Sequence, residues 1–148
     1  MASVDELITT LGQNVETGLG HFRRLVAESK IRPGYFGPRE LLCKLLWWHQ
    51  VAAEGMESVS TGGKPVSIYA SDDEMEARAV GRQAGKTVEH LAVAVEGCQQ
   101  RLAKVAPTIS DPNTTVFVHE DGREDSVTQR LESMVQRWQA AIEEVQAL

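Results

Sequence analysis

Four segments of the sequence carry apolar residues at alternating spacings of three and four, the pattern of a helix with one buried face. They run over residues 4–25, 38–56, 87–105 and 126–145. Packing four such helices against one another buries every apolar face in one core. The sequence therefore predicts an all-α chain, folded over residues 1–148 as a single four-helix bundle domain.

Sequence signals mark where these helices begin and end. A capping box starts at Ser3, at Ser71 and at Ser126, each followed three residues later by Glu or Gln. Pro38 suits the first position of a helix because its fixed φ is already helical. The proline and glycine within residues 30–34 are expected to end the first helix, because a residue before proline avoids the helical conformation.

The helix that starts at Ser71 is expected to break. Gly81 and Gly85 lie in its middle, and each costs about 1 kcal/mol relative to alanine. Thr87 can cap a second segment after the break. The same stretch, residues 81–87, resembles a phosphate-binding P-loop, but its glycine spacing is one residue short and no strand precedes it. We therefore expect no nucleotide site there.

Two long connections separate the helices. Residues 58–66 contain Gly-Gly-Lys-Pro and are predicted to form a surface loop. Residues 106–125 form a longer loop before the last helix, with β-prone residues 115–118 and an Asp-Gly turn at 121–122. This pattern indicates a small hairpin within the loop.

Charge and composition limit the partners. The chain has 15 Lys and Arg against 21 Asp and Glu, a net charge of −6, and no compact basic stripe that could neutralise phosphates. No apolar run approaches the about 20 residues of a membrane span, and the first residues lack a secretory signal. We expect a cytoplasmic protein with no nucleic-acid and no membrane partner, in which Cys43 and Cys98 are buried free thiols.

The histidines and tryptophans are the residues that most invite a functional interpretation. The four histidines fall in four different segments without the i, i+4 spacing of a metal site, which favours structural or surface roles: His21, His49, His90 and His119. Trp47 and Trp48 are adjacent and point in different directions on a helix, so we expect Trp48 to face inward and Trp47 to be peripheral. For Trp138, core packing is favoured over a place in a ligand cavity.

The stretch from Phe36 to His49, Phe-Gly-Pro-Arg-Glu-Leu-Leu-Cys-Lys-Leu-Leu-Trp-Trp-His, resembles the second-helix signature of the DinB-like superfamily, nearest its ClbS/DfsB group. The Gly-Gly-Lys-Pro loop at 62–65 and the last helix from Ser126 also resemble that group. The resemblance implies a four-helix bundle. Many members of the superfamily bind a divalent metal through histidines on the second and last helices, some are thiol-dependent transferases or isomerases, and ClbS-like members protect against a reactive genotoxin.

The metal ligands of the family do not carry over to this chain. The resemblance places the second-helix ligand at Lys44 and the last-helix ligands at Arg137 and Ala141. None of these side chains replaces an imidazole at neutral pH, and the last helix has no histidine. We therefore expect a degenerate metal site, with no metal and no cofactor.

The residues at the metal-ligand positions suggest that the site binds a small molecule in place of a metal. Lys44 and Arg137 would put two cations where the family holds a metal ion, and we hypothesise that they bind an anionic group of a small molecule. Trp48, His49 and Trp138 would line the apolar remainder of the pocket. The alternative is that both cations extend to solvent or pair with a nearby acid.

Three classes of function stay open at this point. The first is a metal-free protein that binds a small ligand in a central pocket, in protection or detoxification. The second is a transferase or hydrolase, metal- or thiol-dependent, with His49 as the best candidate for a general base. The third is a structural module that forms a homodimer through an exposed tryptophan and apolar helix faces.

Overall fold

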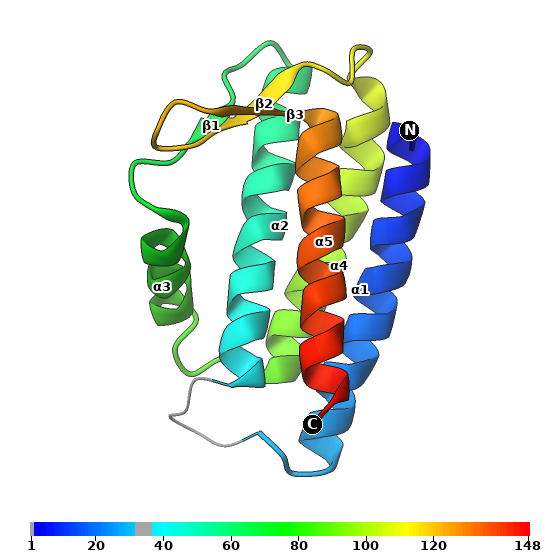
Figure 1. The fold of residues 1–148 in the computed structure, drawn as a ribbon, viewed down its shortest axis with the longest axis vertical. Coiled ribbons are helices and arrows are strands. Elements are labelled where there is room, and N and C mark those ends of the chain that lie inside the picture. Colours follow the sequence, from blue (N-terminus) through cyan, green and yellow to red (C-terminus); the bar gives the residue numbers. More distant parts are fainter. Residues whose placement is uncertain (1, 32–36) are drawn as a thin grey trace.

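The computed structural model describes residues 2–31 and 37–148, which form a mostly helical structure with a small sheet (Figure 1). The helices of these residues are α1 (Val4–Ala27), α2 (Pro38–Ser60), α3 (Asp72–Arg82), α4 (Val88–Val105) and α5 (Val127–Gln146), with a short 3₁₀ turn at Ala106–Thr108. The strands are β1 (Val66–Ser67), β2 (Thr115–Val118) and β3 (Glu124–Ser126). Phe36 and residues 32–34 of the expected turn lie outside the described residues.

The four long helices lie side by side, with the main core between them (Figure 1). Helix α1 packs against α4 and α5, and α2 packs against the same two helices. The apolar stripes of the sequence supply this core, which includes Leu11, Phe22, Leu42, Met56, Leu91, Leu102, Leu131 and Val145. The predicted helical character of the chain is confirmed. Among the described helices, none combines the length and the apolar character that crossing a membrane requires.

The expected helix starts are confirmed by hydrogen bonds. The side chains of Ser3, Ser71, Thr87 and Ser126 each accept a bond from the backbone N–H three residues later, at 3.1 to 3.2 Å. The expected break between α3 and α4 is also present, and Gly85 takes a φ of +80° within it. A residue with a side chain rarely adopts this conformation, so glycine at this position serves the turn rather than a phosphate.

The sheet crosses one end of α2 and α5 (Figure 1). Strands β2 and β3 pair antiparallel, so the hairpin predicted before the last helix is confirmed. Strand β1 adds to β2 in parallel, with Val66 opposite Phe117. The prediction of a plain loop over residues 58–66 is therefore wrong at both ends, because α2 continues to Ser60 and Val66 belongs to β1. Two residues are too few to show strand periodicity, and only the distant β2 gives them a partner.

A second apolar cluster lies on the other side of α2. Helix α3 and the sheet cover this side, and the cluster consists of Trp47, Trp48, Val51, Ile68, Ala70, Met75, Ala79 and Phe117. Trp47 is 4% exposed and Trp48 is 2% exposed. The expectation that Trp47 is peripheral is therefore wrong, because α2 is covered on two sides. No exposed tryptophan is left on α2 to form the dimer contact that was one of the open alternatives.

At Gly55, helix α2 lies close against the sheet. A Cβ added there would overlap the backbone carbonyl oxygen of Val116 on β2, which has little freedom to move. We expect Gly55→Ala to lower the free energy of unfolding by about 1–3 kcal/mol. The energetic cost of relieving this overlap exceeds the stability that alanine gains from its higher helix propensity. Urea denaturation measures the change.

The matched control for Gly55→Ala is Gly20→Ala on α1. A Cβ at Gly20 meets no atom within 4 Å, so this variant is expected to gain about 0.5–1 kcal/mol from helix propensity alone. Equal effects of the two substitutions would show that the approach of α2 to β2 is not tight.

Candidate functional site

Three of the five predicted site residues line one cavity. Lys44 and Trp48 lie one turn apart on α2, and Arg137 faces them from α5. The cavity has a volume of about 180 Å³. Its remaining lining residues are mostly small or apolar, with two acids: Leu41, Leu45, Glu76, Ala140, Ala141 and Glu144. The cavity therefore combines cationic groups, carboxylates and one aromatic ring.

The Arg137 guanidinium is only partly satisfied. Its Cζ lies 3.7 Å from the centroid of the Trp48 ring, a close cation–π contact. Its terminal nitrogens lie 3.6 Å from a carboxylate oxygen of Asp72 and 3.6 Å from one of Glu76. These separations exceed hydrogen-bond length, and the buried Nε has no hydrogen-bond partner among the described residues. Arg137 thus keeps donors that a ligand can use.

Glu76 connects the cavity to α3. It accepts a hydrogen bond of 3.0 Å from the indole Nε1 of Trp48. The same oxygen, Oε2, is the one nearest Arg137. One carboxylate therefore holds the aromatic ring and neutralises part of the charge of the arginine beside it.

Lys44 is the second cation of the cavity. Its side chain is half-buried, and within residues 2–31 and 37–148 it makes no ion pair or hydrogen bond. The alternative, that both cations extend to solvent or pair with a nearby acid, fits the two side chains in different ways: Arg137 approaches acids, and the half-buried Lys44 has no partner within this part of the chain. A free ammonium beside a partly satisfied guanidinium favours an anion.

His49 and Trp138 lie elsewhere, and their predicted place in the pocket is corrected. Trp138 Nε1 donates a hydrogen bond of 3.3 Å to His49 Nδ1, and His49 Nε2 lies 3.0 Å from Gln99 Oε1. Because Nδ1 accepts, Nε2 carries the proton and donates to Gln99. His49 is 0% exposed, and burial lowers the pKa of its imidazole to about 4. This is the environment of a neutral structural histidine, closed to substrate.

Arg130 is a residue that the sequence analysis missed. It is 1% exposed, and its Cζ lies 4.5 Å from the ring centroid of Phe117 and 5.0 Å from that of Trp48. Burial lowers the pKa of the guanidinium to about 10. One feature of the sequence could have pointed to Arg130. It lies seven residues before Arg137, and this spacing places both arginines on one face of α5 beside the apolar stripe.

Asp125 holds Arg130 and the hairpin together. Its Oδ2 lies 3.6 Å from Arg130 Nη1 and 2.8 Å from His119 Nε2. His119 Nδ1 in turn lies 3.2 Å from a guanidinium nitrogen of Arg123. Both nitrogens of His119 are therefore engaged by residues of the hairpin, which fits a role in stabilising the hairpin itself.

The described residues offer little for metal or thiol chemistry. Among them, no group of three or more His, Cys, Asp or Glu side chains is placed to hold a metal ion. Cys43 and Cys98 are free and buried, as predicted, and burial raises the pKa of both thiols. A raised pKa reduces the thiolate fraction, which is the nucleophilic form.

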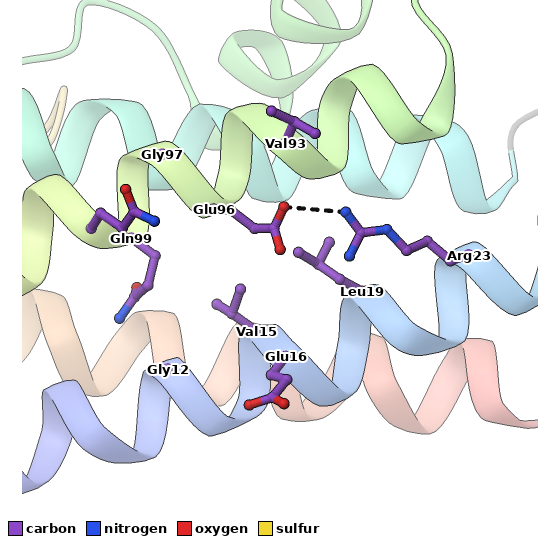
Figure 2. A pocket seen from close by; sticks show the side chains of 10 residues that line it. Gly12, Val15, Glu16, Leu19, Arg23, Val93, Glu96, Gly97 and Gln99 are labelled. Carbon is purple, nitrogen blue, oxygen red and sulfur yellow. Dashed lines mark hydrogen bonds and ion pairs between the residues drawn. The ribbon is translucent and has the colours of Figure 1, made fainter.

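A larger groove of about 640 Å³ lies between α1 and α4, and Figure 2 shows Val15 and Leu19 on its α1 side. The Arg23 guanidinium pairs across it with Glu96, and it also binds Glu89, which raises its pKa. Because the one cation of this groove among the described residues is fully engaged, the groove offers less for an anion than the cavity at Lys44 and Arg137.

Comparison of the chain with protein-family models gives no match, and comparisons with curated proteins and with solved structures give none either. The resemblance to the DinB-like superfamily therefore rests on the sequence motifs. The chemistry of the site is interpreted from its own geometry.

Proposed function

We propose that this protein is a DinB-like four-helix bundle that binds a small anionic molecule, without a metal, in the cavity between α2 and α5. The observation that carries the proposal is that Lys44 and Arg137 line the same cavity as the indole of Trp48. The role that the resemblance suggests for this binding is protection against a reactive small molecule in the cytoplasm.

The family relationship has one structural argument in its favour. Lys44, Arg137 and Ala141 are the three positions that match the metal ligands of the superfamily, and they come from two different helices. All three line the cavity of about 180 Å³. Their convergence is what a shared architecture with an altered site would produce.

The lining chemistry defines the class of ligand. A guanidinium fork recognises carboxylate or phosphate oxygens, and an ammonium adds a second positive charge. The apolar walls and the indole fit a small flat body attached to the anion. Because the cavity has only about the volume of six water molecules, the ligand that fits it as it stands is small.

Isothermal titration calorimetry at low salt tests the proposal with three probes of similar size. Benzoate and phenyl phosphate are anionic, whereas benzamide is a neutral counterpart of benzoate. We expect both anions to bind and benzamide to bind at least tenfold more weakly, because it lacks the charge that the two cations recognise. Equal affinity for benzoate and benzamide would overturn anion recognition.

Lys44→Gln is expected to weaken binding of phenyl phosphate about tenfold or more, since a hydrogen bond to a charged group contributes about 1.5–3 kcal/mol. The matched control is Lys104→Gln, which removes the same charge from an exposed position on α4. Full affinity in Lys44→Gln, or an equal loss in the control, would place the anion elsewhere.

A further inference from the structure

The two carboxylates that lie within ion-pair distance of Arg137, among the described residues, come from α3. Asp72 and Glu76 lie four residues apart, on one face of this helix, and each approaches a different terminal nitrogen of the guanidinium at 3.6 Å. A bound carboxylate or phosphate would likewise place two oxygens opposite the two terminal nitrogens of the guanidinium. The chain therefore supplies its own anions at the site where a ligand anion is proposed.

Helix α3 is a minor part of the packing. It lies beside α2, outside the group of four long helices (Figure 1), and its buried residues are Met75 and Ala79. At its C-terminal end, Arg39 donates hydrogen bonds to the backbone carbonyls of Gln83 and Lys86. The end that carries Asp72 and Glu76 is the opposite one. An element with few buried contacts is one that can shift without opening the main core.

The size of the cavity agrees with a closed arrangement. Pockets for small molecules usually measure about 300–1,000 Å³, whereas this one measures about 180 Å³. Glu76 is itself one of the lining residues. If its side chain leaves, the cavity beside Trp48 and Arg137 becomes larger and the guanidinium loses one of its two carboxylate neighbours.

We propose that α3 is an inhibitory lid whose carboxylates, Asp72 and Glu76, occupy Arg137 until an anionic ligand takes their place. This inference rests on the proposed anion site and adds its regulation. Binding exchanges one set of ion pairs for another: the ligand's oxyanion pairs with Arg137, and the α3 carboxylates turn to solvent. The two ion pairs that are lost are weak because they are partly exposed and longer than hydrogen bonds. The exchange also breaks the hydrogen bond of 3.0 Å from the Trp48 indole to Glu76, which the new contacts with the ligand must offset.

Removing the negative charges of Asp72 and Glu76 tests whether they compete with the ligand for Arg137. In the double variant Asp72→Asn with Glu76→Gln, the affinity for phenyl phosphate and for benzoate is expected to rise at least tenfold, because neither α3 carboxylate then competes for Arg137. The change Glu76→Gln keeps an acceptor for the Trp48 indole. The matched control is Asp73→Asn, which removes an exposed acid from the same first turn of α3, away from Arg137.

Hydrogen exchange of the wild-type protein gives a second readout that does not depend on any variant. Saturating phenyl phosphate is expected to speed amide exchange in residues 72–82 while leaving the four long helices unchanged. Ligand binding with unchanged exchange in α3, or with equal affinity in wild type and the double variant, would overturn the lid alone. If neither protein bound phenyl phosphate or benzoate, the proposed anion site would fail, and the lid with it.

Discussion

Arg130→Ala is expected to lower the free energy of unfolding by about 3–5 kcal/mol. The side chain is 1% exposed and lies against the rings of Trp48 and Phe117, so its removal leaves a void between two aromatic groups. It also removes a cation from beside Asp125. Breaking a buried ion pair from one side typically costs this much, and Asp125 is left, among the described residues, with only its contact to His119. Urea denaturation with a linear extrapolation measures the change.

Two further variants separate the causes of this loss. Arg101→Ala removes an arginine whose ion pair with Glu57 is exposed, and it is expected to cost only about 0–1 kcal/mol. Arg130→Met keeps most of the packing volume and removes the charge, and its cost is expected to be well below that of Arg130→Ala. An effect of Arg130→Ala no larger than that of Arg101→Ala would show that Arg130 does not support the sheet and α2.

The second large effect is a loss of stability in mild acid that depends on His49. Burial lowers the pKa of this imidazole from 6.5 to about 4, so between these values the unfolded chain binds a proton that the folded chain excludes. Stability from this group is therefore complete above pH 6.5 and is lost as the pH falls toward 4. The expected loss between pH 7 and pH 5 is about 2 kcal/mol.

Urea denaturation of wild type and His49→Gln at both pH values checks this expectation. Glutamine offers a donor and an acceptor but does not titrate, so the variant should lack the His49 part of the pH dependence. The difference between the two proteins removes the contribution of all other titrating groups. An identical pH dependence would mean that His49 is protonated in the folded protein, which would contradict its hydrogen bond from Trp138.

The local features of the fold could be predicted because the sequence carries their signals nearby. The capping serines and the glycine-weakened break between α3 and α4 all depend on residues within one or two turns. The burial of Trp47 and the pairing of β1 could not be predicted in this way. Both require α3 and β2, which are distant in sequence, to cover one side of α2.

The five predicted site residues fall into two groups, those that line the cavity and those that do not, for a geometric reason. Successive residues on a helix differ by about 100° in direction. Trp48 and Arg137 face the cavity, so their neighbours His49 and Trp138 turn away and meet each other in the core. The motif resemblance pointed to a stretch of each helix and did not account for the rotation of adjacent side chains.

The carboxylates of the site had no signal in the sequence. Asp72 and Glu76 belong to a run of acids at the start of α3, where Asp73 and Glu74 look equivalent to them. Only the packing of α3 against α2 selects which two of these acids approach Arg137. Their contact with Arg137 therefore follows from the tertiary structure alone.

Whether Arg137 holds the anion is tested most directly by a proton–nitrogen correlation spectrum of the arginine Nε–H groups. The Nε of Arg137 is buried and has no hydrogen-bond partner among the described residues, so burial protects its proton from exchange and its resonance reports on an oxyanion that binds the terminal nitrogens of the same guanidinium. Arg137→Lys assigns the signal. We predict that phenyl phosphate shifts the Arg137 resonance and leaves that of Arg101 in place. A saturating titration that leaves the Arg137 resonance unmoved would contradict the proposed site.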